Sequence, residues 1–194
     1  QNWRTFIRNH ATEIWACDFV QTFDVFFRPL FALAFVALGS RAVVHVGVTY
    51  HPTDTWVAQQ LREATPFGEG PRFLLRDNDD KYGGQLARLA AACGIRVLRT
   101  PVRAPRANAF CERFIGSARR ECLDHILVLG QGHLARVLGE YVRFFNADRP
   151  HQGIGQRVPA RADHPLPPRC PIGAGRLQSR AVLGGLHHAY EVRG

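Results

Sequence analysis

Two consecutive apolar stretches constrain the fold of this 194-residue chain most strongly. Residues 31–38 are apolar at every position and lack a helix start signal, which favours a strand buried on both faces of a sheet. Residues 42–48 are rich in valine and predict a second strand. Because only residues 39–41 link the two stretches, we expect them to form a hairpin.

The remaining chain alternates between short apolar runs and amphipathic stretches. Further strands are predicted over residues 14–20, 72–76 and 95–98, and helices over residues 56–64, 85–93, 108–124 and 133–146. A three-stranded meander followed by alternating helices and strands predicts an α/β fold. We expect a mixed five-stranded sheet flanked by helices on both faces.

The domain organisation expected from composition has one main unit. Residues 1–12 are polar and are interpreted as the remnant of a missing upstream region. Residues 13–158 form the predicted core domain. Residues 159–194 begin with a Pro- and Gly-rich stretch, which predicts a linker followed by a short C-terminal segment.

The charge of the chain is carried by arginine and indicates a polyanionic partner. There are 25 Lys+Arg against 16 Asp+Glu, a formal net charge of +9, and Lys81 is the only lysine. A guanidinium group binds phosphate through a planar fork of donors. The five cysteines are scattered without a C-x-x-C pair, which argues against a disulfide scaffold or a zinc finger and suits a reducing cytosol. No apolar run reaches the ~18 residues of a membrane span.

Three carboxylates occupy positions that suit a divalent cation. Asp18 lies within a predicted strand among apolar neighbours, where a charge is costly unless it is compensated. Asp77 follows directly on another strand, and Glu112 lies on a predicted helix face opposite the aromatic residues. Mg²⁺ and Mn²⁺ prefer oxygen ligands, and two such ions about 3.5–4 Å apart can clamp a phosphodiester.

Several motifs around these carboxylates occur in an order that is typical of one family. They are Trp15-Ala16-Cys17-Asp18-Phe19, Leu75-Arg76-Asp77-Asn78-Asp79-Asp80-Lys81-Tyr82, Arg103 to Arg113 with Asn108 and Glu112, Tyr141 with Asn146 and Arg149-Pro150-His151, and residues 183–191. From about Trp15 onward, the chain resembles the retroviral-integrase-type catalytic core of bacterial insertion-sequence transposases. These proteins belong to the ribonuclease-H-like superfamily and carry an Asp-Asp-Glu metal triad.

The resemblance implies an enzyme that cleaves DNA and transfers the strand, a metal-dependent nucleotidyltransferase mediating DNA integration. The implied catalytic residues and metal ligands are Asp18, Asp77 and Glu112, which would bind two Mg²⁺ or Mn²⁺ ions. Many relatives have glycine where this chain has Asp79, so that Asp77, Asp79 and Asp80 are crowded together here. We assign Asp77 because it alone follows directly on the strand, and Asp79 competes with it for this role. The residues expected to contact DNA are Arg103, Arg106, Asn108, Arg113, Arg119 and Arg120.

The same resemblance implies the partners and the location of the protein. We expect it to bind the element ends and target DNA, to act as a homo-multimer on DNA, and to lie in the bacterial cytoplasm, on the nucleoid when bound. No membrane partner is expected. Two other functions are open. One is a ribonuclease-H-like nuclease that cuts without joining, and the other is an inactive DNA-binding remnant.

Plainer interpretations of the individual residues are also open. Asp18 could be a strand-end residue capped by backbone amides, and residues 77–80 could be a solvated turn. Glu112 could pair with a neighbouring arginine on a solvated basic face. Cys111 has no partner pattern for nucleophilic catalysis, which favours a packing role.

Overall fold

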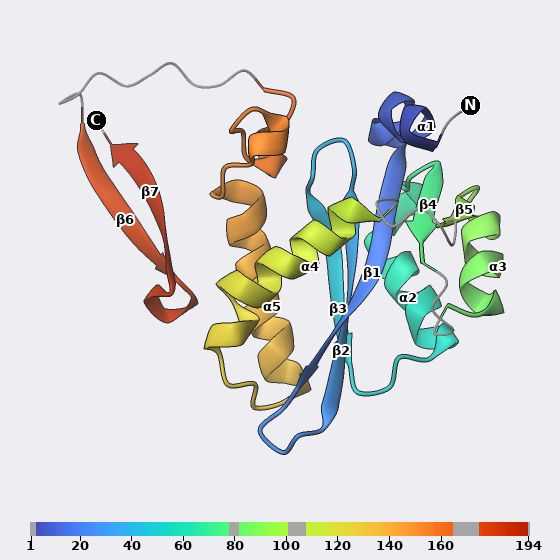
Figure 1. Cartoon of the computed structure of the whole chain (residues 1–194), viewed down its shortest axis with the longest axis horizontal. Helices are drawn as coiled ribbons and strands as arrows, with labels where there is room; N and C mark the ends of the chain where they lie inside the picture. The colour runs from blue at the N-terminus through green and yellow to red at the C-terminus, as the bar shows by residue number, and fades with distance from the viewer. Residues whose placement is uncertain (1–2, 78–81, 101–107, 165–174, 194) are drawn as a thin grey trace.

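The computed structural model describes residues 3–77, 82–100, 108–164 and 175–193 (Figure 1). Its centre is a five-stranded sheet with the strand order β3-β2-β1-β4-β5. The strands are β1 (Ile14–Phe23), β2 (Pro29–Ala37), β3 (Val43–Thr49), β4 (Phe73–Arg76) and β5 (Arg96–Arg99). β1, β2 and β3 pair antiparallel, whereas β4 and β5 run parallel to β1. The predicted mixed sheet, a meander followed by parallel strands, is confirmed.

Helices cover both faces of this sheet. α2 (Asp54–Ala64) and α3 (Gly84–Ala92) lie on one face, and α4 (Ala109–Glu121) and α5 (Gln131–Ala147) lie on the other (Figure 1). The central strand β2 contributes Leu33 and Phe35 to the first face and Ala32, Ala34 and Val36 to the second. Burial of alternate residues on opposite faces explains why this strand is apolar at every position. No helix in the described part of the chain has the length and apolar character needed to cross a membrane.

The N-terminal residues form a helix that the sequence interpretation missed. α1 (Trp3–Asn9) packs Trp3, Phe6 and Ile7 against the core on the α4/α5 face. The ring of Phe6 meets the ring of Phe73 edge to face, with centroids 5.2 Å apart. Apolar residues at positions i, i+3 and i+4 make one helical stripe. The polar residues between them explain why the segment resembled a solvated remnant.

The C-terminal residues form a separate antiparallel hairpin of β6 (Arg176–Val182) and β7 (His187–Arg193), which lies beside α5 (Figure 1). The imidazole of His187 stacks on Phe144 with centroids 4.9 Å apart, and its Nε2 lies 2.6 Å from the carbonyl oxygen of Glu121. The amide of Leu183 donates to the Glu140 carboxylate. These contacts dock the hairpin on the α4/α5 pair, while the proposed boundary at residue 159 stays a prediction.

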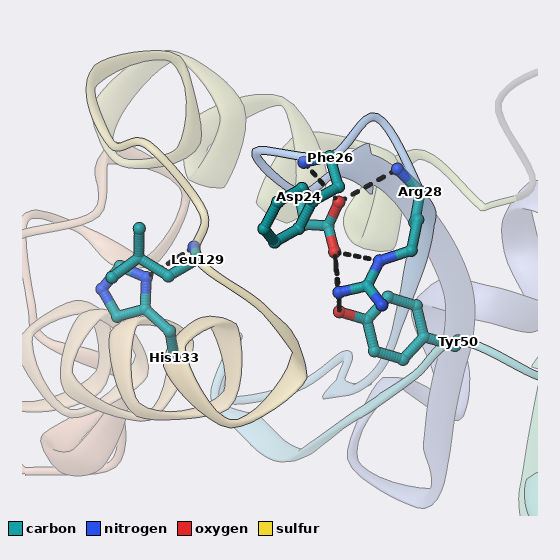
Figure 2. Close-up of polar contacts among 6 residues, drawn as sticks. All are labelled: Asp24, Phe26, Arg28, Tyr50, Leu129 and His133. Carbon is teal, nitrogen blue, oxygen red and sulfur yellow. Dashed lines mark hydrogen bonds and ion pairs between the residues drawn. The ribbon is translucent and has the colours of Figure 1, made fainter.

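The turn between β1 and β2 is held by one buried carboxylate, Asp24 (Figure 2). Its oxygens accept hydrogen bonds from the amides of Phe26 and Arg28, from Arg28 Nε and from the Tyr50 hydroxyl. Burial alone raises the pKa of Asp24, but the hydrogen bonds from Arg28, Tyr50 and the amides outweigh burial and lower this pKa to about 2. The bonds hold a turn in which Phe27 adopts a left-handed φ of 59°.

Candidate active site

The first two candidate carboxylates lie within β1 and directly after β4, two strands that pair in parallel. Ile14 lies opposite Phe73 and Ala16 lies opposite Leu75, the last pair of this ladder. Asp18 follows Ala16 by two residues within β1, and Asp77 follows Leu75 by two residues, one residue past the end of β4. Ala16 belongs to the core beneath α4 and α5, and the alternation of side chains along β1 puts Asp18 on that same face of the sheet.

The third carboxylate, Glu112, is exposed in the first turn of α4. Two contacts hold this turn against β1 and β2 beside Asp18. The side-chain amide of Asn108 lies 3.4 Å from the carbonyl oxygen of Cys17, and the thiol of Cys111 lies 3.9 Å from the carbonyl oxygen of Ala34. Ala34 is the β2 partner of Asp18. The helix that carries Glu112 is thus attached to the sheet immediately beside Asp18.

All three carboxylates affect the pKa of the Cys111 thiol. Burial raises the pKa of this thiol well above its ordinary value, and the negative charges of Asp18, Glu112 and Asp77 raise it further. The pKa of Cys17 is raised to about 12, mainly by burial and also by the charges of Asp18 and Asp77. Both thiols therefore stay protonated at neutral pH, which favours packing over nucleophilic roles.

The donor set has the chemistry that a hard divalent cation requires, because all three side chains offer carboxylate oxygens. One further observation fits such an ion. Asn108 Oδ1, one turn before Glu112, is buried without a hydrogen-bond partner among the described residues and offers a further oxygen acceptor to such a site. Within the described ranges, however, no group of three or more His, Cys, Asp or Glu side chains is arranged to hold a metal ion. The alternative ligand Asp79 lies outside the described residues.

The arginines expected to contact DNA are placed only in part. Arg103 and Arg106 lie outside the described residues. Arg113, Arg119 and Arg120 are exposed on α4, and Arg119 also donates to the carbonyl oxygen of Gln21. Their exposure leaves them accessible to a polyanion.

Asn108 differs from these arginines in its burial. The residue is 4% exposed, and its expected contact with DNA stays a prediction. Helical geometry correctly places Asn108 on the face of Glu112, but this end of the face packs against β1. Asn108 therefore anchors the start of α4, as its contact with Cys17 indicates.

A partly buried polar network behind α4 was not found from the sequence. Glu121 accepts two hydrogen bonds from Arg149, at 2.9 and 2.6 Å, and one from the hydroxyl of Tyr141 at 2.8 Å. Burial raises the pKa of Glu121, but the bonds from Arg149 and Tyr141 outweigh burial and lower it. Tyr141 and Arg149 belong to one of the motifs noted above, whereas nothing in the local pattern of Glu121 marks it as their partner.

Comparisons with known proteins agree with this architecture. Residues 93–159 match the family of integrase core domains. The chain is 27% identical over 150 residues to a 39.2 kDa protein of insertion element IS476 from Xanthomonas euvesicatoria, covering 77% of this chain and 43% of that protein. It is 26% identical over 149 residues to a 31.7 kDa protein of insertion element IS407 from Burkholderia multivorans, covering 76% and 54%. The chain thus spans about half the length of the curated relatives it matches.

Solved structures show the same fold. The catalytic core domain of HTLV-2 integrase superimposes with a TM-score of 0.62 at 14% identity, covering 79% of this chain and 97% of that domain. A chain of the simian T-cell lymphotropic virus intasome gives a TM-score of 0.65 at 15% identity, covering 94% and 67%. The fold is therefore that of an integrase catalytic core. With the sequence matches, this confirms the resemblance to the integrase-type catalytic core of insertion-element transposases.

Proposed function

We propose that the chain is the catalytic core of a transposase that cuts DNA at the ends of a mobile element and joins it to target DNA. The observation that carries the proposal is the parallel pairing of β1, which contains Asp18, with β4, which Asp77 directly follows. Glu112 also supports the proposal, because it lies in the first turn of α4, which packs on the face of the sheet that carries Asp18. The integrase-core match and the insertion-element relatives support the same activity.

The proposed metal ligands are Asp18, Asp77 and Glu112, with two Mg²⁺ or Mn²⁺ ions as the cofactor. Such ions, when bound, activate the attacking oxygen and stabilise the leaving oxygen of a phosphodiester. The proposed ligands would supply three carboxylates, one from β1, one from the residue after β4 and one from the first turn of α4. Asn108 and Cys111 hold the turn of α4 that carries Glu112 against β1 and β2. The HTLV-2 integrase core has been solved in complex with magnesium, which supports this choice of ion.

The proposed partner is DNA, namely the element ends and the target. Arg113, Arg119 and Arg120 are exposed on the helix of Glu112 and would bind backbone phosphates without reading bases. We propose that Arg103 and Arg106 add to this contact. We further propose a homo-multimer on DNA in the bacterial cytoplasm, and dimeric and trimeric forms of the HTLV-2 core support multimerisation.

The decisive test replaces Glu112 by glutamine. Glu112→Gln keeps the size of the side chain and removes one negative charge from the proposed metal ligands. We expect both nicking and joining of labelled element ends to be lost, because both steps use the same carboxylates. DNA affinity should hold or rise slightly, since a charge that repels phosphate has been removed.

The matched control is Glu69→Gln, which alters an exposed glutamate just before β4 and should leave activity unchanged. Retention of joining by Glu112→Gln would contradict the proposal. If the unaltered protein nicks element ends and never joins them, the nuclease alternative is correct. If it binds DNA with neither reaction in Mn²⁺, the inactive-remnant alternative is correct.

A further inference from the structure

A second basic site lies on the flank of α4, away from the proposed carboxylates. A cavity of about 830 Å³ is bounded by α4, by the C-terminal end of α5 and by residues 150–156, which include the short helix η4 (Gln152–Ile154). Four arginines line it, namely Arg41, Arg113, Arg120 and Arg149. Among the described residues that line the cavity there is no Asp or Glu.

One of these cations, Arg41, lies partly buried in the turn between β2 and β3. Its guanidinium carbon lies 3.8 Å from the centre of the Phe110 ring, and a Cβ at Gly153 would lie 3.8 Å from one of its terminal nitrogens. The Nε atom of Arg41 is buried and has no hydrogen-bond partner in the part of the chain that the structure describes. Burial, and then the charge of Arg113, lower the pKa of Arg41. A buried donor with neither partner nor counter-ion is costly, so an anion here would stabilise the cavity.

The four arginines differ in how far their charge is already compensated. Arg149 is paired with Glu121 through two hydrogen bonds. Arg41, Arg113 and Arg120 form no ion pair within the described part of the chain. Three guanidinium groups that lack an ion-pair partner in the described ranges surround one cavity. Together they should strongly attract an anion with several acceptor oxygens.

The cavity is distinct from the face of α4 that carries the proposed active site. At 100° per residue, Arg119 lies about 20° around the helix from Glu112, whereas Arg113 and Arg120 lie about 80–100° away. Two basic faces therefore share one helix. Because a helix is rigid over this length, an anion held in the cavity would have a set position relative to Glu112.

We propose that this cavity binds a backbone phosphate of a DNA strand, with Arg41, Arg113 and Arg120 as its ligands. The inference rests on the proposed function and deepens it, since it adds a second point at which DNA is held. The guanidinium fork matches the oxygens of a phosphate, and the volume lies within the roughly 300–1,000 Å³ of small-ligand sites, which accommodates a nucleotide unit. The overall charge of +9 favours a nucleic acid over a neutral ligand.

The test compares Arg41→Gln and Arg113→Gln with Arg136→Gln, which removes the same charge from an exposed position on α5 outside the cavity. Binding of a labelled duplex is measured by fluorescence anisotropy over a range of salt concentrations. Each cavity variant should bind more weakly and reduce the slope of log affinity against log salt by up to about 0.9, one phosphate contact. Arg136→Gln should reproduce the unaltered slope. Equal losses in all three variants would overturn the proposal, because they would reflect net charge alone.

Two further arms identify the occupant and separate this inference from the proposed function. Thermal melts in inorganic phosphate, matched in ionic strength with chloride, should show stabilisation that both cavity variants lose. If the cavity variants lose this stabilisation by phosphate but bind DNA like the unaltered protein, the cavity holds a free anion only. This result would overturn the proposal. If the cavity variants instead change the oligomeric state of the protein and leave DNA binding unchanged, the cavity binds an acidic protein segment. This result would also overturn the proposal.

Arg119→Gln, on the face of Glu112, serves as the reference for DNA binding itself. If this variant weakens binding while the cavity variants do not, the cavity inference and the proposed phosphate contact of Arg113 fail, and the proposed activity stands. If the unaltered protein binds no DNA, the proposed function fails. Circular dichroism verifies the fold of each variant, and Arg113→Gln at an exposed position keeps the test available should Arg41→Gln be unstable.

Discussion

The hydroxyl of Tyr141 offers the sharpest test of the network behind α4. Tyr141 is completely buried, and its only polar side-chain atom donates to a Glu121 oxygen at 2.8 Å. Tyr141→Phe removes this donor and leaves the ring packing in place. A hydrogen bond to a charged group contributes about 1.5–3 kcal/mol. Glu121 keeps both bonds from Arg149 and its side chain is 25% exposed, so we expect a loss of about 1–2 kcal/mol, near the lower end.

For a chain of this length, that loss corresponds to a fall in Tm of about 2–8 °C, measurable by circular dichroism or calorimetry. The fall should be largest at neutral pH and should shrink in acid, because protonation of Glu121 removes the charge that the hydroxyl stabilises. Tyr190→Phe is the matched control, because Tyr190 is 64% exposed. This variant should melt at the same temperature as the unaltered protein. A Tm within about 1 °C of the unaltered protein at neutral pH would refute the reasoning, as would a difference that does not shrink in acid.

Two other predictions concern pH and metal. The folded-state pKa of Asp24 is about 2, below the unfolded value of roughly 4, so its contribution to stability is present above pH ~4 and is lost as the pH falls toward 2. The urea midpoint of the unaltered protein should decrease as the pH is lowered through this window. Asp24→Asn is already less stable at neutral pH, and its midpoint should decrease less. Equal dependence of the two midpoints on pH would contradict the assignment. Millimolar Mn²⁺ should raise the Tm of the unaltered protein but not that of Asp18→Asn, and the absence of any shift in the unaltered protein would count against a metal site.

Hydrophobic patterning along the chain determined the architecture. The uninterrupted apolar residues 31–38 predicted a strand buried on both faces, and β2 is covered by helices on each side. The order of strands and helices predicted the mixed sheet, because a meander followed by parallel crossovers has few compact arrangements. The same order pairs the strand that contains Asp18 with the strand that Asp77 directly follows, which is why the two aspartates could be expected near each other.

The tertiary structure alone decided which polar groups meet. Asn108 shares a helical face with Glu112, but only the docking of α4 on β1 shows that its side chain is buried. Glu121 and Arg149 are 28 residues apart, and Arg41 reaches Phe110 from a different element. Periodicity reports which side of an element is apolar, because that depends on a regular backbone repeat. The pairing of individual charges depends on how separate elements pack, and no local repeat in the sequence encodes it.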